Sequence, residues 1–292
     1  MAHPTAVLAR IWAIVWRVGL FLLVWGALLA GFLVPLGPRL KLLGQVHSLR
    51  LQLYVEFSGA VTMLVATWLA THFLDHRPFA TIGLAPRRLP RHLGLGAVTG
   101  MGWIGISLGA AWLGGWLAYR PGQVLPWAVL LGAGVAVVLN VLTQQLILCG
   151  YVLQTIRARA GVPLAMVVAA AMFVGLHAPA FKGAWLPAMN VFLAGFLFCT
   201  AYQLAGQLWF PIGMHVAWNY TVGPVLGLTI NGSQYLARGW RVFDLTGPAR
   251  LTGGAFGLEG GLIVTAATCL MLVVVAATLR RATAAPGKPR AA

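Results

Sequence analysis

The sequence predicts an all-α fold, a polytopic membrane bundle of about eight transmembrane helices. Apolar residues make up 60% of the 292 residues and charged residues only 8%, with a mean hydropathy of +0.86. Such a chain has too little polar surface for a water-soluble globule of this size. Its apolar stretches reach the roughly 20 residues that a helix needs to cross a bilayer, and they lack the alternating pattern of barrel strands. The bilayer is therefore the expected solvent.

Eight apolar stretches, separated by charged residues, proline and glycine, are the expected spans. In chain order they cover 8–36, 51–74, 93–119, 126–156, 163–178, 185–204, 208–229 and 256–279. The first stretch is too long for a signal peptide and has no small-residue cleavage site, so we expect it to stay in the mature chain. We expect a single transmembrane domain over 1–281, followed by a disordered basic tail over 282–292 that is rich in alanine and proline.

The net charge of +16 comes from 20 lysines and arginines that are spread over short loops and both ends of the chain. Because no domain concentrates them, we do not expect nucleic acid as a partner. With eight spans both termini lie on one side, and more of the basic residues fall on that side than on the other. The positive-inside rule then predicts cytoplasmic termini in a multi-pass protein of the cell (inner) membrane, with membrane lipid as its partner.

Polar side chains within the spans are costly in a membrane and point to function. They form three clusters: Gln144, Gln145 and Cys149 in TQQLILCGY; Phe173 and His177 in AMFVGLHAPA; His215 and Asn219 in LWFPIGMHVAWNY. The three cysteines of the chain lie in apolar stretches without a CxxC pair, which argues against disulfides and zinc-thiolate sites.

The spacing and depth of these clusters suggest one shared site. His215 and Asn219 are four residues apart, so both lie on one face of a helix. Counted along the expected helices, Gln144, His177 and His215 lie at similar depths, about 10 to 20 Å from the cytoplasmic ends. We therefore expect a common polar pocket. Unrelated buried side chains, each hydrogen-bonded to a neighbouring carbonyl, are the alternative.

The order and spacing of these motifs resemble the CPBP family of membrane-embedded proteases, which includes the type 2 CAAX prenyl proteases and bacteriocin-processing enzymes. That family carries Glu-Glu-x-x-x-Arg on one helix, Phe-x-x-x-His on the next and His-x-x-x-Asn two helices later. The stretches GFLFCTAYQLAGQLWFPIGMHVAWNY and RPFATIGLAPRR are also similar to the family. The resemblance covers about 77–219 and suggests a CPBP-like core at about 77–229.

The resemblance implies hydrolysis of a peptide bond near a membrane surface, with a glutamate that activates water and two histidines that help to bind a metal or steady the oxyanion. The family positions are matched at Phe173, His177, His215 and Asn219 and changed at Gln144 and Gln145, in place of the glutamates, and at Cys149, in place of the arginine. A glutamine amide takes up no proton at working pH, so a general base worth about a hundred- to ten-thousand-fold in rate is missing.

The three changes are consistent with one another. An arginine beside two uncharged amides would be an unpaired ion in the bilayer, at about 2.5 to 3.5 kcal/mol. Joint loss of the cluster favours a natural degenerate homologue over deliberate substitution, which would more simply keep the arginine. We expect none of the remaining acids, Glu56, Asp75, Asp244 and Glu259, to lie where it can replace the lost pair.

Three functions are consistent with these residues. The leading hypothesis is a protease homologue with lost or strongly reduced peptide hydrolysis, which keeps a polar pocket for a peptide or membrane-protein partner. The second is an active intramembrane metalloendopeptidase, in which His177 and His215 hold zinc or another divalent metal; two histidines and an asparagine are a thin ligand set for it. The third is a transporter or channel, although the two halves show no matched broken helices.

Overall fold

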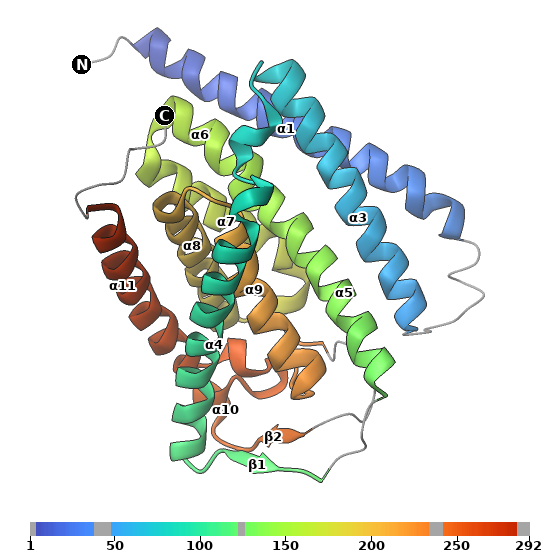
Figure 1. Cartoon of the computed structure of the whole chain (residues 1–292), viewed down its shortest axis with the longest axis vertical. Coiled ribbons are helices and arrows are strands. Elements are labelled where there is room, and N and C mark those ends of the chain that lie inside the picture. The colour runs from blue at the N-terminus through green and yellow to red at the C-terminus, as the bar shows by residue number, and fades with distance from the viewer. Residues whose placement is uncertain (1–3, 38–47, 122–125, 234–241, 285–292) are drawn as a thin grey trace.

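The computed structural model describes residues 4–37, 48–121, 126–233 and 242–284, which form a bundle of helices (Figure 1). In chain order the helices are α1 (Pro4–Leu33), α3 (Leu49–Leu69), α4 (Leu89–Leu113), α5 (Trp127–Gln145), α6 (Leu153–Ala160), α7 (Val162–Phe181), α8 (Trp185–Ala205), α9 (Trp209–Tyr220), α10 (Ala249–Thr252) and α11 (Leu262–Ala284). Two short antiparallel strands, β1 (Leu117–Tyr119) and β2 (Phe243–Leu245), pair near one end of the bundle. The predicted all-α membrane bundle is confirmed.

Seven helices in the described part of the chain are long and apolar enough to cross a membrane, where eight spans were expected. The expected span 208–229 is instead the 12-residue helix α9, which continues into a π-helical turn at Thr221–Val225. α9 lies inside the bundle against α4, α5 and α8 (Figure 1). Because protein surrounds α9, its backbone does not need the length that a lipid-exposed helix requires.

Two expected span boundaries were wrong. The span 93–119 ends as a helix at Leu113, after which the chain forms β1. The span 256–279 begins with 3-10 turns, and the helix α11 starts only at Leu262. Gly257 explains the late start, because its φ of +92° belongs to a region that disfavours side chains, and an added Cβ would meet the Thr229 carbonyl.

The first and last described residues lie on the same side of the bundle, the upper one in Figure 1. An even number of expected spans requires this arrangement. α11 continues to Ala284, so the first residues of the expected tail are helical, which their alanines favour. The remainder of that tail, 285–292, lies outside the described residues. The orientation of this end in the membrane stays a prediction.

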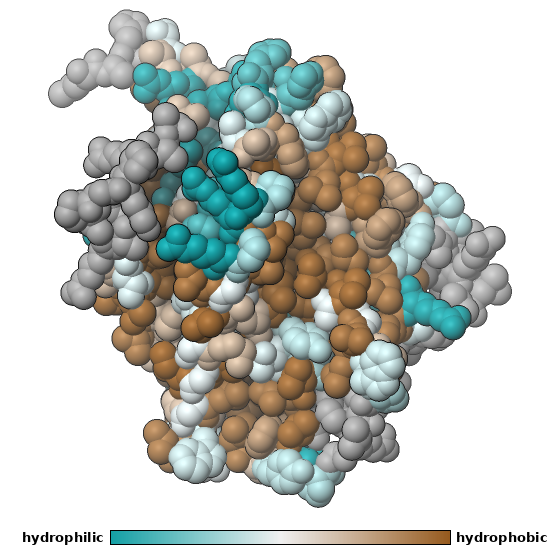
Figure 2. Space-filling model, in the orientation of Figure 1, coloured by the Kyte–Doolittle hydropathy of each residue, from teal (hydrophilic) through white to brown (hydrophobic). Residues whose placement is uncertain are grey.

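Large apolar side chains cover the outside of the bundle. Leu23 of α1 is 72% exposed and Leu113 of α4 is 80% exposed. Figure 2 shows apolar residues across the middle of one face and the most hydrophilic residues towards its upper end. An exposed apolar surface of this extent, with polar residues at the rim, is what a lipid-solvated bundle requires.

Glycines at the contact between α4 and α9 allow the two helix backbones to approach more closely than residues with a Cβ would. A Cβ at Gly96 or Gly100 of α4 would meet the backbone carbonyl of Phe210 or Met214, and one at Gly213 of α9 would meet the Leu93 carbonyl. Small residues in this spacing let helix backbones touch in membranes, where packing replaces the hydrophobic effect as the driving force. This contact sets the position of α9 and of the polar side chains that it carries.

We expect Gly213→Ala to lower the free energy of unfolding by about 1–3 kcal/mol, because the methyl group pushes two backbones apart. Thermal unfolding of the detergent-solubilised protein measures the loss. Gly102→Ala on α4 is the matched control, since nothing lies within 4 Å of its added Cβ, and it should leave the melting temperature unchanged or higher. Equal melting temperatures for the two variants would contradict this account of the contact.

Candidate functional site

The two glutamines of the first motif lie at the end of α5, where the α-helix widens into a π-helical segment, Leu146–Val152. π-Helical insertions in α-helices are frequent at functional sites, because they change the direction of the side chains before and after them. Gln145 is completely buried and points into the bundle, whereas Gln144 is half-buried. The two neighbouring amides therefore have different surroundings.

His215 of α9 lies between two amide groups. Its Nδ1 is 3.2 Å from Nε2 of Gln145, and its Nε2 is 3.2 Å from Nδ2 of Asn219, one turn further along the same helix. A neutral imidazole has one N–H and one bare nitrogen, so one amide donates to the ring while the other faces it through its oxygen. All three side chains are at least 94% buried. The site is thus a dry, hydrogen-bonded triad that links α5 to α9.

Aromatic rings connect this triad to the second histidine. Phe198 of α8 stacks on His215 with ring centroids 4.6 Å apart. Phe173 of α7 lies 6.1 Å from His215 and 4.6 Å from His177, between the two imidazoles. Gly195 of α8 leaves the space for that ring, because an added Cβ would lie 3.1 Å from it. The expected pair of residues on α7 therefore lies next to the triad of α5 and α9.

His177 has a defined protonation pattern in its neutral form. Its Nδ1 lies 2.8 Å from the carbonyl oxygen of Phe173, one turn earlier in α7. A carbonyl only accepts hydrogen bonds, so Nδ1 carries the proton and Nε2 is the bare nitrogen. The side chain is half-buried, and it is the more accessible of the two histidines.

A carboxylate that we did not expect at the site is linked to it. Asn140 Nδ2 donates to Glu56 Oε2 of α3 over 3.0 Å, and Gln144 Nε2 donates to Asn140 Oδ1 over 2.7 Å. Glu56 is therefore two hydrogen bonds from the first motif. A single acid inside an apolar span was the sequence signal that pointed to it.

The hydrogen bonds of the triad do not include Cys149, the third position of the first motif. Its side chain is completely buried, and its thiol contacts the thiol of Cys199 on α8. The backbone carbonyl of Cys149 accepts a hydrogen bond from Gln154. An arginine at this position would have no room in the present packing.

The comparison with known families supports the resemblance seen in the motifs. Residues 126–221 match the model of the family described as type II CAAX prenyl endopeptidase Rce1-like. In this segment the chain is similar to that family, in line with the CPBP resemblance of its motifs. The matched segment runs from the start of α5 to the end of α9, so it contains all three motifs of the candidate site. No curated protein and no solved structure matches the chain.

The donor set of the candidate site fits a divalent metal poorly. Both ring nitrogens of His215 already face amide groups, and His177 offers only its Nε2. Among the described residues no three His, Cys, Asp or Glu side chains are grouped closely enough to hold a metal ion. A catalytic zinc usually takes three protein ligands, more than these side chains offer.

The other three acids have partners of their own. Asp75 faces Arg17, Arg77 and Arg159 at one end of the bundle, and Asp244 pairs with Arg120 over 2.7 Å.

Glu259 lies in the turn before α11 and holds the neighbouring segments together. It accepts hydrogen bonds from Trp218 Nε1 at 2.8 Å and from the Asn231 backbone at 2.9 Å. Burial raises the pKa of the Glu259 carboxyl, although both hydrogen bonds oppose that shift. This carboxyl supports α9 from the turn rather than joining the triad.

We expect Asn140→Leu to destabilise the protein by about 1–3 kcal/mol, because it leaves the carboxyl of Glu56 and the amide of Gln144 without this hydrogen-bond partner. Thermal unfolding in detergent measures the change. Glu56→Gln is the matched variant, since its amide oxygen can still accept from Asn140 without a charge, and it should be neutral or stabilising. An Asn140→Leu protein as stable as the native one would show that the chain of hydrogen bonds is absent.

Proposed function

We propose that this CPBP homologue has lost, or strongly reduced, peptide hydrolysis and uses its polar pocket to bind a peptide or a segment of a membrane protein. The observation that carries the proposal is the Gln145 amide against His215, at the position where the family has a glutamate. The amide keeps a hydrogen bond to the imidazole, yet it cannot take a proton from water.

The pocket can still recognise a peptide bond. The amides of Gln144, Gln145 and Asn219 and the imidazole of His177 can donate to or accept from a backbone amide or carbonyl in a dry environment, where hydrogen bonds are strong. Glu56 does not restore the base, because the amides of Asn140 and Gln144 stand between it and the triad. Amide groups do not change protonation at working pH, so the hydrogen-bonded side chains between Glu56 and the first motif cannot pass a proton.

We also propose that both termini face the cytoplasm in the cell membrane. The first residues of α1 and the last residues of α11 lie at the same end of the bundle (Figure 1). Arg17, Arg77 and Arg159 gather around Asp75 in a cluster near that end. Basic residues on the cytoplasmic side follow the positive-inside rule.

We expect the native protein to cleave prenylated CAAX-type peptides at the background rate. The Gln144→Glu/Gln145→Glu variant should cleave them at least about a hundredfold faster, which is the lower end of the rate effect of a general base. A glutamate at 145 fills the same volume and can accept a hydrogen bond from His215. The triple variant that adds Cys149→Arg is measured in parallel, with thermal unfolding as a check on overpacking at this buried position.

The control adds His215→Ala to the double variant and should return cleavage to the background. Native cleavage at the rate of the double variant would disprove the loss of activity. Binding of the same peptide to the native protein, measured by fluorescence anisotropy, tests the retained pocket separately, and it should weaken in His177→Ala.

An active metalloendopeptidase is the competing function. Because the donor set is thin, we expect purified native protein to contain far less than one zinc ion per chain by elemental analysis, and His177→Ala to leave that content unchanged. Stoichiometric zinc that disappears in His177→Ala, together with cleavage that a chelator stops, would favour the metal-dependent enzyme instead.

A further inference from the structure

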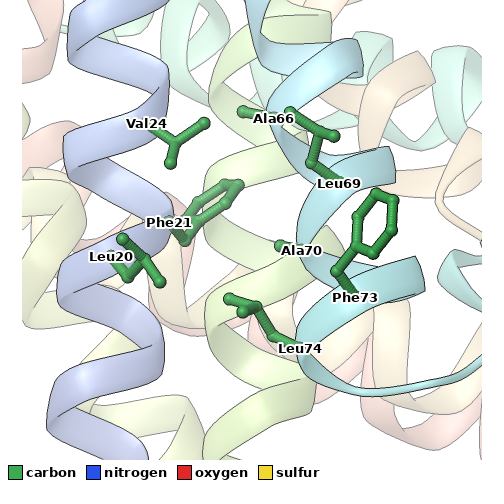
Figure 3. A pocket seen from close by; sticks show the side chains of 8 residues that line it. All are labelled: Leu20, Phe21, Val24, Ala66, Leu69, Ala70, Phe73 and Leu74. Carbon is green, nitrogen blue, oxygen red and sulfur yellow. The ribbon is translucent and has the colours of Figure 1, made fainter.

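An apolar groove runs between α1 and the end of α3, outside the polar site. It has a volume of about 220 Å³ and is lined entirely by apolar residues. Leu20, Phe21 and Val24 line it from α1; Ala66, Ala70 and Phe73 line it from α3 and its π-helical extension, Ala70–Leu74 (Figure 3). Leu20 is 39% and Phe73 56% exposed, so the groove opens towards the lipid.

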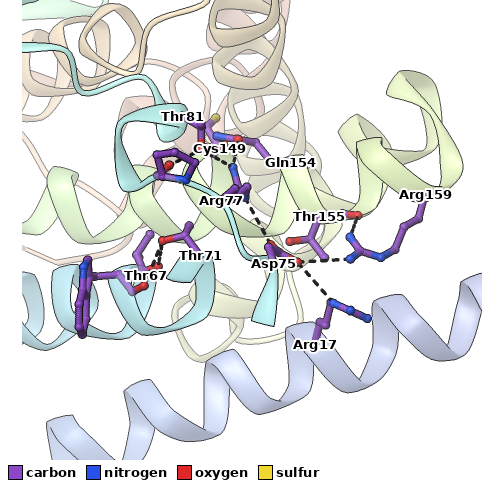
Figure 4. A network of polar contacts seen from close by, with 12 residues as sticks. Arg17, Thr67, Thr71, Asp75, Arg77, Thr81, Cys149, Gln154, Thr155 and Arg159 are labelled. Atoms are coloured by element: carbon purple, nitrogen blue, oxygen red, sulfur yellow. Dashed lines mark hydrogen bonds and ion pairs between the residues drawn. The ribbon is translucent and has the colours of Figure 1, made fainter. Parts of the chain in front are cut away.

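A cluster of charges lies at one end of this groove. Asp75 directly follows the π-helical extension, and Arg17 precedes Leu20 by about one helical turn. The Asp75 carboxylate is 3.3 to 3.4 Å from guanidinium nitrogens of Arg17, Arg77 and Arg159 (Figure 4). Three cations around one anion leave a local net charge of +2. Figure 4 shows that they converge from three different segments of the chain.

The carboxylate does not satisfy these arginines. Its side chain is only 7% exposed, whereas the three arginine side chains are 20–22% exposed and so remain accessible from outside. Nη2 of Arg77 is buried without a hydrogen-bond partner, although Nη1 of the same residue bonds Gln154 and Thr81. The surplus positive charge and the exposed parts of the three guanidinium groups favour a second anion at this cluster.

We propose that the groove and the arginine cluster bind one anionic phospholipid. An acyl chain lies along Phe21 and Ala70, and the phosphate pairs with Arg17 and Arg77. The phosphate accounts for the surplus charge, because arginine pairs with phosphate through charge-assisted hydrogen bonds. The acyl chain accounts for an opening without a polar lining. A free phosphate would use only the arginines, and a zwitterionic lipid would bring its own positive charge to them.

The attachment of α1 gives this lipid a structural role. Val18 and Phe21 are the buried apolar residues of α1, and most of its other described side chains are half-buried or exposed. Phe21 packs on Tyr151 with ring centroids 4.5 Å apart, next to the first motif. A lipid that bridges Arg17 of α1, Arg77 and Arg159 of α6 would hold α1 against the helices that carry the site.

The experiment titrates delipidated full-length protein in detergent with phosphatidylglycerol, phosphatidylcholine or inorganic phosphate. Native mass spectrometry counts the bound lipid, and thermal unfolding reports the stabilisation. We expect one phosphatidylglycerol to bind and raise the melting temperature. Phosphatidylcholine should bind at least about fivefold more weakly, because the positive charge of its choline group opposes the arginines. Inorganic phosphate alone should give no stabilisation, because it leaves the apolar groove empty.

Two variants test the two halves of the site against a matched control. Arg17→Gln removes the cation at the groove and should weaken phosphatidylglycerol binding about fivefold, whereas Arg10→Gln, an exposed position on the same helix, makes the same change in net charge and should have no effect. Leu20→Trp fills the groove from its exposed side without a change in charge and should also weaken binding.

Other outcomes overturn the proposal. Equal binding of phosphatidylcholine would indicate a general lipid surface, and equal loss in the Arg17 and Arg10 variants would indicate unspecific charge attraction. Full stabilisation by inorganic phosphate would indicate an anion site without a lipid. A prenylated peptide with a free carboxylate that binds with Arg17 dependence, while phosphatidylglycerol does not, would assign the groove to a peptide.

Discussion

The close backbone contact between α4 and α9 is the constraint on which the candidate site depends. α9 has only 12 residues before its π-helical turn, so the thickness of a bilayer does not determine its depth. Gly96, Gly100 and Gly213 determine it instead, because each sits where a side chain would meet a backbone carbonyl. At that depth His215 reaches the end of α5. A shift of α9 by one residue would turn both of its polar side chains away from Gln145.

The sequence predicted most of the fold because a helix in contact with lipid must be apolar over the thickness of the bilayer, and hydropathy detects such stretches. Long apolar stretches predicted the helices α1, α3, α7 and α8, and the continuous segment from α5 to α6, to within a few residues. It failed where protein contacts replace lipid. α9 is apolar but short, since its neighbours bury it, and the residues before α11 are apolar but turn, since glycines with positive φ such as Gly257 interrupt the helix. Composition alone does not distinguish an apolar turn from the start of a span.

The site was predictable in its helical pairs and less so in its connections between helices. Spacing along one helix places His215 beside Asn219 and Phe173 beside His177, and the structure has both contacts. The link from Glu56 through Asn140 joins residues 84 positions apart, so no local pattern reveals it. Cys149 shows the converse. It stands where the family has an arginine, yet its thiol packs against Cys199 in the core.

The triad persists for reasons of stability as much as function, and this separates the two histidines. Removing His215 would leave the buried amides of Gln145 and Asn219 without their partner, at about 1–3 kcal/mol for each orphaned group. Its retention therefore follows from the buried network even without catalysis. His177 has no such network: one ring nitrogen bonds the Phe173 carbonyl, and the side chain is half-exposed. Because little in the packing requires an imidazole there, His177 is the main support for the proposed binding role.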